Sequence, residues 1–178
     1  DGTANSSHGD GIDVTDATNF SDWGEATVAS TVQLEPGLWS LDNFGQVLVA
    51  TIANGKTFTW DAGGTLPLTT RAATTTSGFA TGNNPTATRA SLISPTTRHL
   101  IHLGTETTIG DPTTQDDMYI RFSDQEDINT YAPSVTNAAG TQRLQDGSRI
   151  IGSLKAKETI LIWTDNALYT MKFIGAPF

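Results

Sequence analysis

Residues 148–175, SRIIGSLKAKETILIWTDNALYTMKFIG, constrain the fold more than any other part of the sequence. They hold three short apolar runs, at 150–154, 159–163 and 168–173, with turn-like polar residues between them. Short runs of β-branched and aromatic residues that are separated by polar residues are typical of strands and not of helices. In the last run the side chains alternate, which places three large apolar groups on one face. This stretch therefore predicts an antiparallel meander.

The same pattern occurs twice earlier in a degenerate form. Leu48-Val49 and Leu100-Ile101 align with Leu161-Ile162, and an apolar residue stands seven positions before each leucine. Polar turns are expected at 42–45, 94–97 and 155–158, and third strands at 57–60, 118–122 and 168–173. An offset of about fifty to sixty residues suits a three- or four-stranded unit such as a propeller blade.

The chain is therefore predicted to be all-β, with antiparallel meander blades that form part of a β-propeller-like fold. Residues 1–30 are expected to be an irregular polar arm or loop, and residues 31–178 the propeller-like blades. The three repeats fall near 38–61, 89–124 and 148–174. Another short strand is expected at 141–144, long loops at 62–88 and 106–117, and no helix anywhere.

Composition limits the function classes. The net charge of −9 argues against a nucleic-acid-binding surface and against attraction to an anionic membrane. Cysteine is absent, which excludes disulfides and thiolate metal sites. No run approaches the roughly 18 apolar residues of a membrane span. The chain starts at Asp1 and stops soon after a strong strand, so we expect a piece of a longer protein whose next blade is missing.

Two acidic patterns could bind metal or act on glycans. Residues 8–16 resemble one turn of the calcium-binding nonapeptide repeat, but His8 and Thr15 depart from it and a single copy cannot share ions. A solvated loop is the favoured interpretation. A second acidic cluster could supply a glycosidase carboxylate pair, but no member stands in an apolar context that would raise its pKa. We interpret its members as solvated turn acids: Asp116, Asp117, Asp124, Glu126 and Asp127.

His99 and His102 stand three positions apart in one predicted strand. That spacing places them on opposite faces, where they cannot easily share a metal. His102 is interpreted as an ordinary polar position on a strand face. Residues 40–45 resemble the Asp-box of sialidase propellers, but the glycine is one place late and the Thr-Trp is missing, so a β-turn is predicted. The large aromatics are expected to pack between blades: Trp39, Trp60, Phe122, Tyr131, Trp163, Tyr169 and Phe173.

These interpretations leave no catalytic, cofactor-binding or metal-ligating residue. The sequence contains no phosphate-binding loop, no Gly-x-Ser-x-Gly elbow and no His-Glu-x-x-His. We therefore expect a protein that is not an enzyme and that needs no cofactor.

An ordered set of phrases resembles a group of tailed-bacteriophage virion proteins, the tail-tube or nozzle-like proteins with a β-propeller. The phrases are WSLDNFGQ at 39–46, TFTWD at 57–61, RHLIHLG at 98–104, IRFSDQE at 120–126, AAG at 138–140, DGS at 146–148, IWTDNALY at 162–169 and IGAPF at 174–178. The resemblance covers roughly residues 38–178, and residues 1–30 match nothing in it. Members of the group are much longer, so the chain would be part of the propeller.

The resemblance implies a structural component of the phage tail, located in the virion, in a nozzle or hub ring around the DNA exit channel. It implies a homo-oligomeric ring with heterologous interfaces that close. The expected partners are other tail or portal-adaptor proteins and passing genomic DNA, which is not bound sequence-specifically, and no membrane insertion is expected. An acidic channel wall would let DNA slide.

Two other classes stay open on the sequence alone. One is a glycan-binding or glycan-cleaving propeller module that recognises a host surface. The other is a fragment of a secreted β-rich adhesin.

Overall fold

The computed structural model describes residues 37–61, 73–74 and 84–175. The chain divides into two compact units, Asp1–Leu38 and Trp39–Phe178. The architecture below belongs to the second unit. The predicted arm at 1–30, with its nonapeptide-like motif, lies outside the described residues, as does most of the predicted loop at 62–88.

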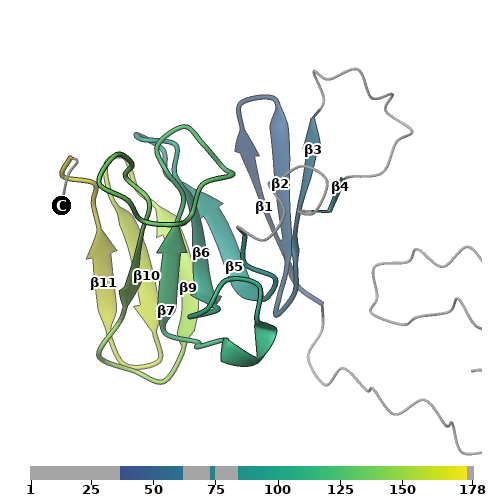
Figure 1. The fold of residues 1–178 in the computed structure, drawn as a ribbon. Coiled ribbons are helices and arrows are strands. Elements are labelled where there is room, and N and C mark those ends of the chain that lie inside the picture. The colour runs from purple at the N-terminus through teal and green to yellow at the C-terminus, as the bar shows by residue number, and fades with distance from the viewer. Residues whose placement is uncertain (1–36, 62–72, 75–83, 176–178) are drawn as a thin grey trace, which may run out of the picture. The chain divides into compact units, whose positions relative to one another are not determined.

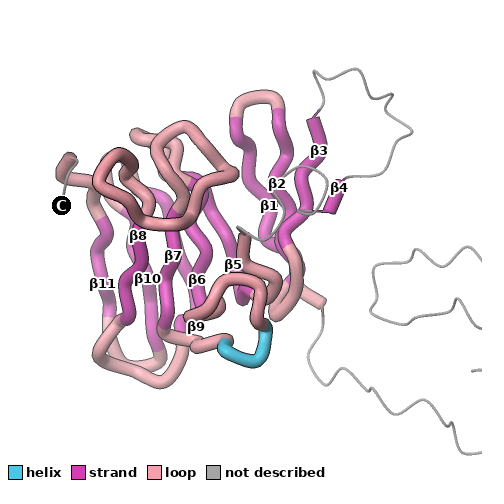
Figure 2. The backbone as a smooth tube through the Cα atoms, viewed as in Figure 1, coloured by secondary structure: helices cyan, strands magenta, loops and turns pink. Residues whose placement is uncertain are grey.

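The described residues form three antiparallel sheets, each of them a meander in chain order (Figures 1 and 2). The first sheet contains β1 (Trp39–Phe44), β2 (Val47–Ile52), β3 (Thr57–Asp61) and β4 (Ala73–Thr74). The second contains β5 (Thr88–Ile93), β6 (Leu100–Thr105), β7 (Tyr119–Phe122) and β8 (Gly140–Arg143). The third contains β9 (Ile150–Lys155), β10 (Ile160–Thr164) and β11 (Leu168–Met171).

The all-β antiparallel fold is therefore confirmed. The described part of the chain contains no α-helix, and its single helical turn is a 3-10 turn at Pro112–Thr114. The three sheets form an open stack and not a closed ring of blades. The aligned dipeptides all occupy second strands, since Leu48-Val49 lies in β2, Leu100-Ile101 in β6 and Leu161-Ile162 in β10.

Turn residues fix the ends of the strands. The β1–β2 turn is formed by Gly45 and Gln46, and Gly45 adopts a φ of +65° that glycine tolerates best. Asn54, at a φ of 59°, and Gly55 form the β2–β3 connection, where the sequence predicted a hairpin. The turn predicted at 42–45 begins too early, because its first three residues pair with β2 as part of β1.

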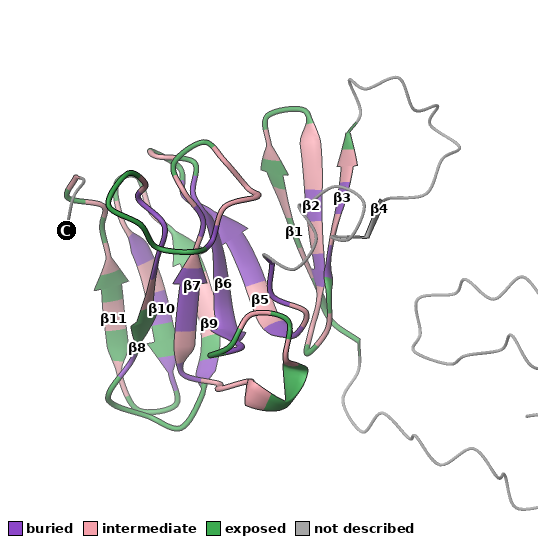
Figure 3. Cartoon of the chain, viewed as in Figure 1, coloured by how far each residue is buried: buried purple, intermediate pink, exposed green. Residues whose placement is uncertain are grey.

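An aliphatic cluster joins the second and third sheets. Its buried members come from both sheets and from the segments beside them: Leu92, Ile101, Leu103, Met118, Ile120, Leu144, Ile150, Ile160 and Ile162. A smaller cluster joins the first and second sheets through Val49, Ile93, Leu100 and Tyr131. The second sheet is thus covered on both faces, and all six residues of β6 are buried (Figure 3). Strands buried on both faces usually read as continuous apolar runs, but β6 reads LIHLGT and buries His102 and Thr105 among its apolar residues.

Candidate functional site

A group of buried polar side chains lies between the first and second sheets. We call this group the polar layer. Its members, which are joined by hydrogen bonds into two chains, are Thr51, Thr57, Thr88, Ser91, His102, Thr105 and Tyr131. All seven side chains are buried. Each buried hydroxyl or ring nitrogen in these chains has a partner, as burial of polar groups requires.

The first chain of the polar layer connects two sheets. The Thr51 hydroxyl on β2 lies 2.8 Å from the Thr57 hydroxyl on β3 and 2.6 Å from the Ser91 hydroxyl on β5. A hydrogen bond between side chains of different sheets is made in one alignment only. This chain therefore fixes how the first sheet lies on the second.

His102 is the centre of the second chain. Its Nδ1 lies 3.3 Å from the Thr88 hydroxyl and its Nε2 lies 3.1 Å from the Tyr131 hydroxyl. Burial, with a smaller effect of the nearby charge of Arg121 in the same direction, lowers the pKa of the imidazole from 6.5 to about 3. Burial also raises the pKa of Tyr131 well above its ordinary value, with Asp127 adding to the effect. Both groups are neutral at physiological pH and have no access to a substrate.

His102 lies on the strand face that carries the polar layer, but its complete burial was not predicted from the sequence. Its side chain is fully buried, because the second sheet has a covering layer on each face. His99 points the other way, as the alternation of side chains predicts, since its ring lies 5.0 Å from the ring of Phe173 whereas the ring of His102 lies 5.3 Å from that of Tyr131. No group of three or more potential ligands close enough for a metal ion occurs among the described residues.

A buried carboxylate and a buried guanidinium secure the loop after β6. Glu106 accepts hydrogen bonds from the amide and hydroxyl of Thr86 and, at 2.7 Å, from the amide of Gly110. Arg121 on β7 donates to the carbonyl oxygens of Glu106, at 3.2 Å, and Thr107, at 3.0 Å. Burial lowers the pKa of Arg121, and the charges of Tyr119 and Glu106 partly oppose that effect. These ionic groups hold backbone and do not face a cavity.

Sequence reasoning missed Glu106, because it stands in a threonine-rich polar stretch that reads as an exposed loop. The only local signal is its position directly after β6, a strand whose residues are all buried. Its burial follows from the return of the loop over β7, which local sequence does not specify.

The acidic cluster predicted as solvated turn acids is dispersed by the fold, and four of its members make specific bonds. Asp116 pairs with Arg143 at 2.7 Å and Asp117 pairs with Arg89 at 3.0 Å. Asp124 accepts from the amides of Gln125 and Ala138, and Asp127 accepts from the amide of Asn129 and the hydroxyl of Thr130. Glu126 is exposed, as predicted. No two of these carboxylates share a bonding partner in these contacts.

Asp42 connects the first strands of all three sheets. Its carboxylate accepts from the amide of Ile93 on β5 at 2.7 Å, and from Nζ of Lys155 on β9 at 2.7 Å. Two residues earlier, the Ser40 hydroxyl accepts from the amide of Ser91 at 3.0 Å. The β-turn predicted at 40–45 is therefore wrong for its first five residues, which continue β1 and turn alternate side chains toward β5.

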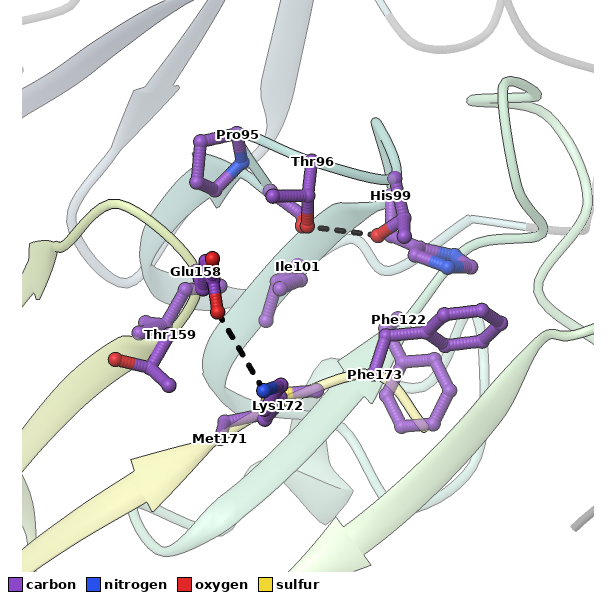
Figure 4. Close-up of a pocket in the computed structure, with 13 residues that line it drawn as sticks. Pro95, Thr96, His99, Ile101, Phe122, Glu158, Thr159, Met171, Lys172 and Phe173 are labelled. Carbon is purple, nitrogen blue, oxygen red and sulfur yellow. Dashed lines mark hydrogen bonds and ion pairs between the residues drawn. The ribbon is translucent and has the colours of Figure 1, made fainter. Parts of the chain in front are cut away.

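The cavities are small or shallow. One of about 60 Å³ lies between the second and third sheets, where His99, Phe122 and Phe173 come together and the pair Glu158–Lys172 lies beside it (Figure 4). Ligand pockets usually have about 300 Å³ or more. A larger groove of about 340 Å³ lies between the edges of the second and third sheets, lined mainly by β11 and the end of β8. Two ion pairs each reach it through their basic member, Arg143 with Asp116 and Lys172 with Glu158.

Comparison of the chain with protein-family models, curated proteins and solved structures found no match. Across the described residues, no helix is long and apolar enough to span a membrane. The protein can therefore be classified by its architecture alone. It consists of stacked antiparallel meander sheets that are held by a buried polar layer. The groups of the polar layer bond to one another inside the fold.

Proposed function

We propose that this chain is a non-enzymatic structural component of a bacteriophage tail, a subunit of a nozzle or hub ring around the DNA exit channel. The observation that carries the proposal is the stack of three successive meander sheets, packed face to face in chain order. Successive blades of a propeller pack in this way. The ordered phrases that resemble tail-tube and nozzle-like proteins supply the second support.

The bonds of Asp42 favour a fan of sheets over a parallel stack. The second sheet lies between the first and third, yet a side chain of β1 reaches a side chain of β9. This contact supports an arrangement in which the first strands of the three sheets converge on one side. Blades arranged around a common axis converge in the same manner, with the first strand of each nearest the axis.

The polar chemistry of the chain suits a rigid assembly. His102, Glu106 and Arg121 are all buried and bonded to other parts of the fold. A structural subunit needs such internal bonds and external interfaces, whereas an enzyme needs reactive groups in contact with a substrate. The proposed partners are further copies in a ring, neighbouring tail or portal-adaptor proteins, and DNA that passes without sequence-specific binding.

The distribution of charge is compatible with DNA that slides past the protein. Residues 1–36 contain seven acidic residues and no lysine or arginine, so they carry −7 of the net charge of −9. Like charges on a channel wall and on phosphates disfavour adhesion. A ring of such subunits would therefore be expected to leave duplex DNA unbound at low salt.

Two experiments test the proposal. Mass spectrometry of the tail fraction of purified virions should detect the chain, and electron microscopy of the purified protein should show closed rings with an axial channel. Absence of the chain from virions would refute the tail assignment.

A glycan-binding module is the second candidate, and it is favoured by the exposed indoles of Trp39 and Trp163. Exposed aromatic rings can act as sugar platforms. A glycan array separates the two functions, because reproducible binding of one glycan class, lost in Trp163→Ala, would support recognition over a purely structural role.

A further inference from the structure

The connection from β7 to β8 contains one buried residue in its middle. We call residues 124–137 of this connection the strap. Tyr131 is fully buried, whereas every other residue of the strap is at least partly exposed. The carboxylate of Asp124 accepts from the amide of Ala138 at 2.7 Å, which brings the two ends of the strap together. The strap is therefore an Ω-loop that is closed at its base.

Most hydrogen bonds of the strap stay within it. One of them joins the amide of Asp124 to the carbonyl oxygen of Thr130 at 2.8 Å. The Tyr131 hydroxyl instead reaches out of the strap, to Nε2 of His102 on β6 at 3.1 Å. Tyr131 and the partly buried Ile128 also belong to the smaller cluster between the first and second sheets. Tyr131 thus attaches the middle of the strap to the fold, directly over His102.

The hydrogen bonds of the polar layer assign the proton positions around His102. The Thr105 hydroxyl donates to the carbonyl oxygen of Ala87 at 2.9 Å, so its oxygen accepts from the Thr88 hydroxyl, also at 2.9 Å. The Thr88 hydroxyl has one hydrogen and must therefore accept from Nδ1–H of His102. That tautomer leaves Nε2 as an acceptor, and the Tyr131 hydroxyl donates to it.

A proton on Nε2 would remove this acceptor. An imidazolium ion carries hydrogens on both nitrogens, so the Tyr131 hydroxyl could no longer donate to His102. The buried hydroxyl hydrogen would then lack its partner, which is unfavourable in the interior. Protonation therefore acts against the bond that holds the strap.

The charges that act on the His102–Tyr131 pair come from β7 and from the strap. Arg121 on β7 lowers the pKa of His102, and Asp127 of the strap raises the pKa of Tyr131. Glu106, directly after β6, acts on Arg121 and accepts bonds from backbone amides. The members of the polar layer on β2, β3 and β5 present hydroxyls, which carry no charge. The charge that acts on the imidazole is thus positive and opposes its protonation.

We infer that the strap is an acid-sensitive cover, which opens when His102 is protonated while the three sheets stay folded. The closed strap keeps the pKa of His102 at about 3, and water under an opened strap would return it toward the ordinary 6.5. Between these values, each fall of one pH unit favours opening by about tenfold. Opening uncovers the polar layer and the smaller cluster. The inference goes beyond the proposed function and does not depend on it.

Hydrogen–deuterium exchange of the full chain, followed by mass spectrometry, tests the inference at pH 7.5 and pH 5.0. Protection factors, corrected for the intrinsic pH dependence of exchange, are compared for peptides from the strap and from β10. The protection of the strap should fall about thirtyfold from the higher pH to the lower. It should also be lower than that of β10 at both pH values, because the strap opens without the rest of the fold.

Three variants separate the contributions. His102→Gln keeps a donor and an acceptor but does not titrate, so the protection of its strap should change less than about threefold between the two pH values. Tyr131→Phe keeps the ring and removes the donated bond, so its strap should be less protected than the wild-type strap at pH 7.5. Val135→Ala is the matched control, because Val135 lies in the strap and is 96% exposed, and it should behave like the wild type. Far-UV circular dichroism checks that each variant folds.

Equal protection of the strap and of β10 would overturn the inference, because the strap would then open only with the whole fold. A wild-type strap whose protection does not change with pH would also overturn it, as would a His102→Gln variant that keeps the wild-type pH response. If His102→Gln does not fold, the wild-type comparison of the strap with β10 still decides. A Tyr131→Phe strap as well protected as the wild-type strap would refute the role of the hydroxyl.

Discussion

The clearest test of the fold's energetics is the pH dependence conferred by His102. The folded protein holds this imidazole neutral, because its pKa is lowered from an ordinary 6.5 to about 3. The unfolded chain binds a proton on the same group below about pH 6.5. In the interval between these two values the unfolded state therefore binds more protons than the folded state. The contribution of His102 to the free energy of unfolding is fully present above its pKa in the unfolded state. It declines as the pH falls toward its pKa in the folded state.

The size of the effect follows from linkage. Below the unfolded pKa, the free energy of unfolding falls by about 1.4 kcal/mol for each pH step. Between pH 8 and pH 5, protonation of His102 in the unfolded chain should therefore lower the free energy of unfolding by about 2 kcal/mol. That is a large share of a typical domain stability of about 5–15 kcal/mol.

Urea unfolding, followed by tryptophan fluorescence at pH 8 and pH 5, measures this loss in the wild type and in His102→Gln. The glutamine amide can donate and accept as the imidazole does, but it does not titrate in this range. The variant is expected to be less stable at both pH values, yet to lose about 2 kcal/mol less than the wild type on acidification.

The comparison removes the contribution of the carboxylates. Burial pushes the pKa of Asp116 upward, but bonds from the amide of Met118 and from Arg143 outweigh it and leave that pKa lowered. The contribution of Asp116 to the free energy of unfolding therefore also decreases as the pH falls, and it decreases equally in both proteins. If the two proteins lost the same free energy within about 0.5 kcal/mol, the idea of a neutral, buried His102 would be refuted.

Four further substitutions test the packing, each by urea unfolding at pH 7. Asp42→Ala leaves the amide of Ile93 without its acceptor and should cost about 1–3 kcal/mol, whereas Lys155→Ala, which removes only the half-exposed partner, should cost less than about 1 kcal/mol. Equal losses would contradict the role assigned to the Ile93 amide. Glu106→Gln places an amide donor among three donors and should cost about 2–4 kcal/mol, and a neutral effect would show that the carboxylate is not needed. Ile162→Ala should cost about 2–5 kcal/mol, because Ile162 is fully buried in the aliphatic cluster, and a loss below about 1 kcal/mol would place it outside the core.

Apolar runs were enough to predict most strands of this fold. The β-branched and aromatic segments around Leu48, Leu100 and Leu161 became the second strands of three sheets. Period-two alternation in β11 also identified its inward residues, since Tyr169 and Met171 pack against the aliphatic cluster. These predictions succeed because strand formation depends on side chains close together in sequence.

The polar layer could not be predicted, because it depends on which face of each sheet is covered. Ser40 and Asp42 read as turn residues, and only their alternation within β1 directs them at the backbone of β5, about fifty residues away in sequence. His102 read as an ordinary polar position on a strand face, and its complete burial could not be predicted for the same reason. Local sequence sets the period of side chains along a strand, but the identity of the neighbouring layer is a long-range property.

The two internal sheet contacts differ in chemistry, and the difference bears on how the stack is specified. The contact between the second and third sheets is aliphatic, so shape and apolar area stabilise it. The contact between the first and second sheets contains hydrogen bonds such as that from Thr51 to Ser91, which contribute little net free energy but cost much when misaligned. A displacement of the first sheet by one residue would break the bonds from Thr51 to Ser91 and from the amide of Ile93 to Asp42, and it would leave the buried Ser91 hydroxyl and the Ile93 amide without these partners. The polar layer thus excludes alternative alignments of the first sheet on the second.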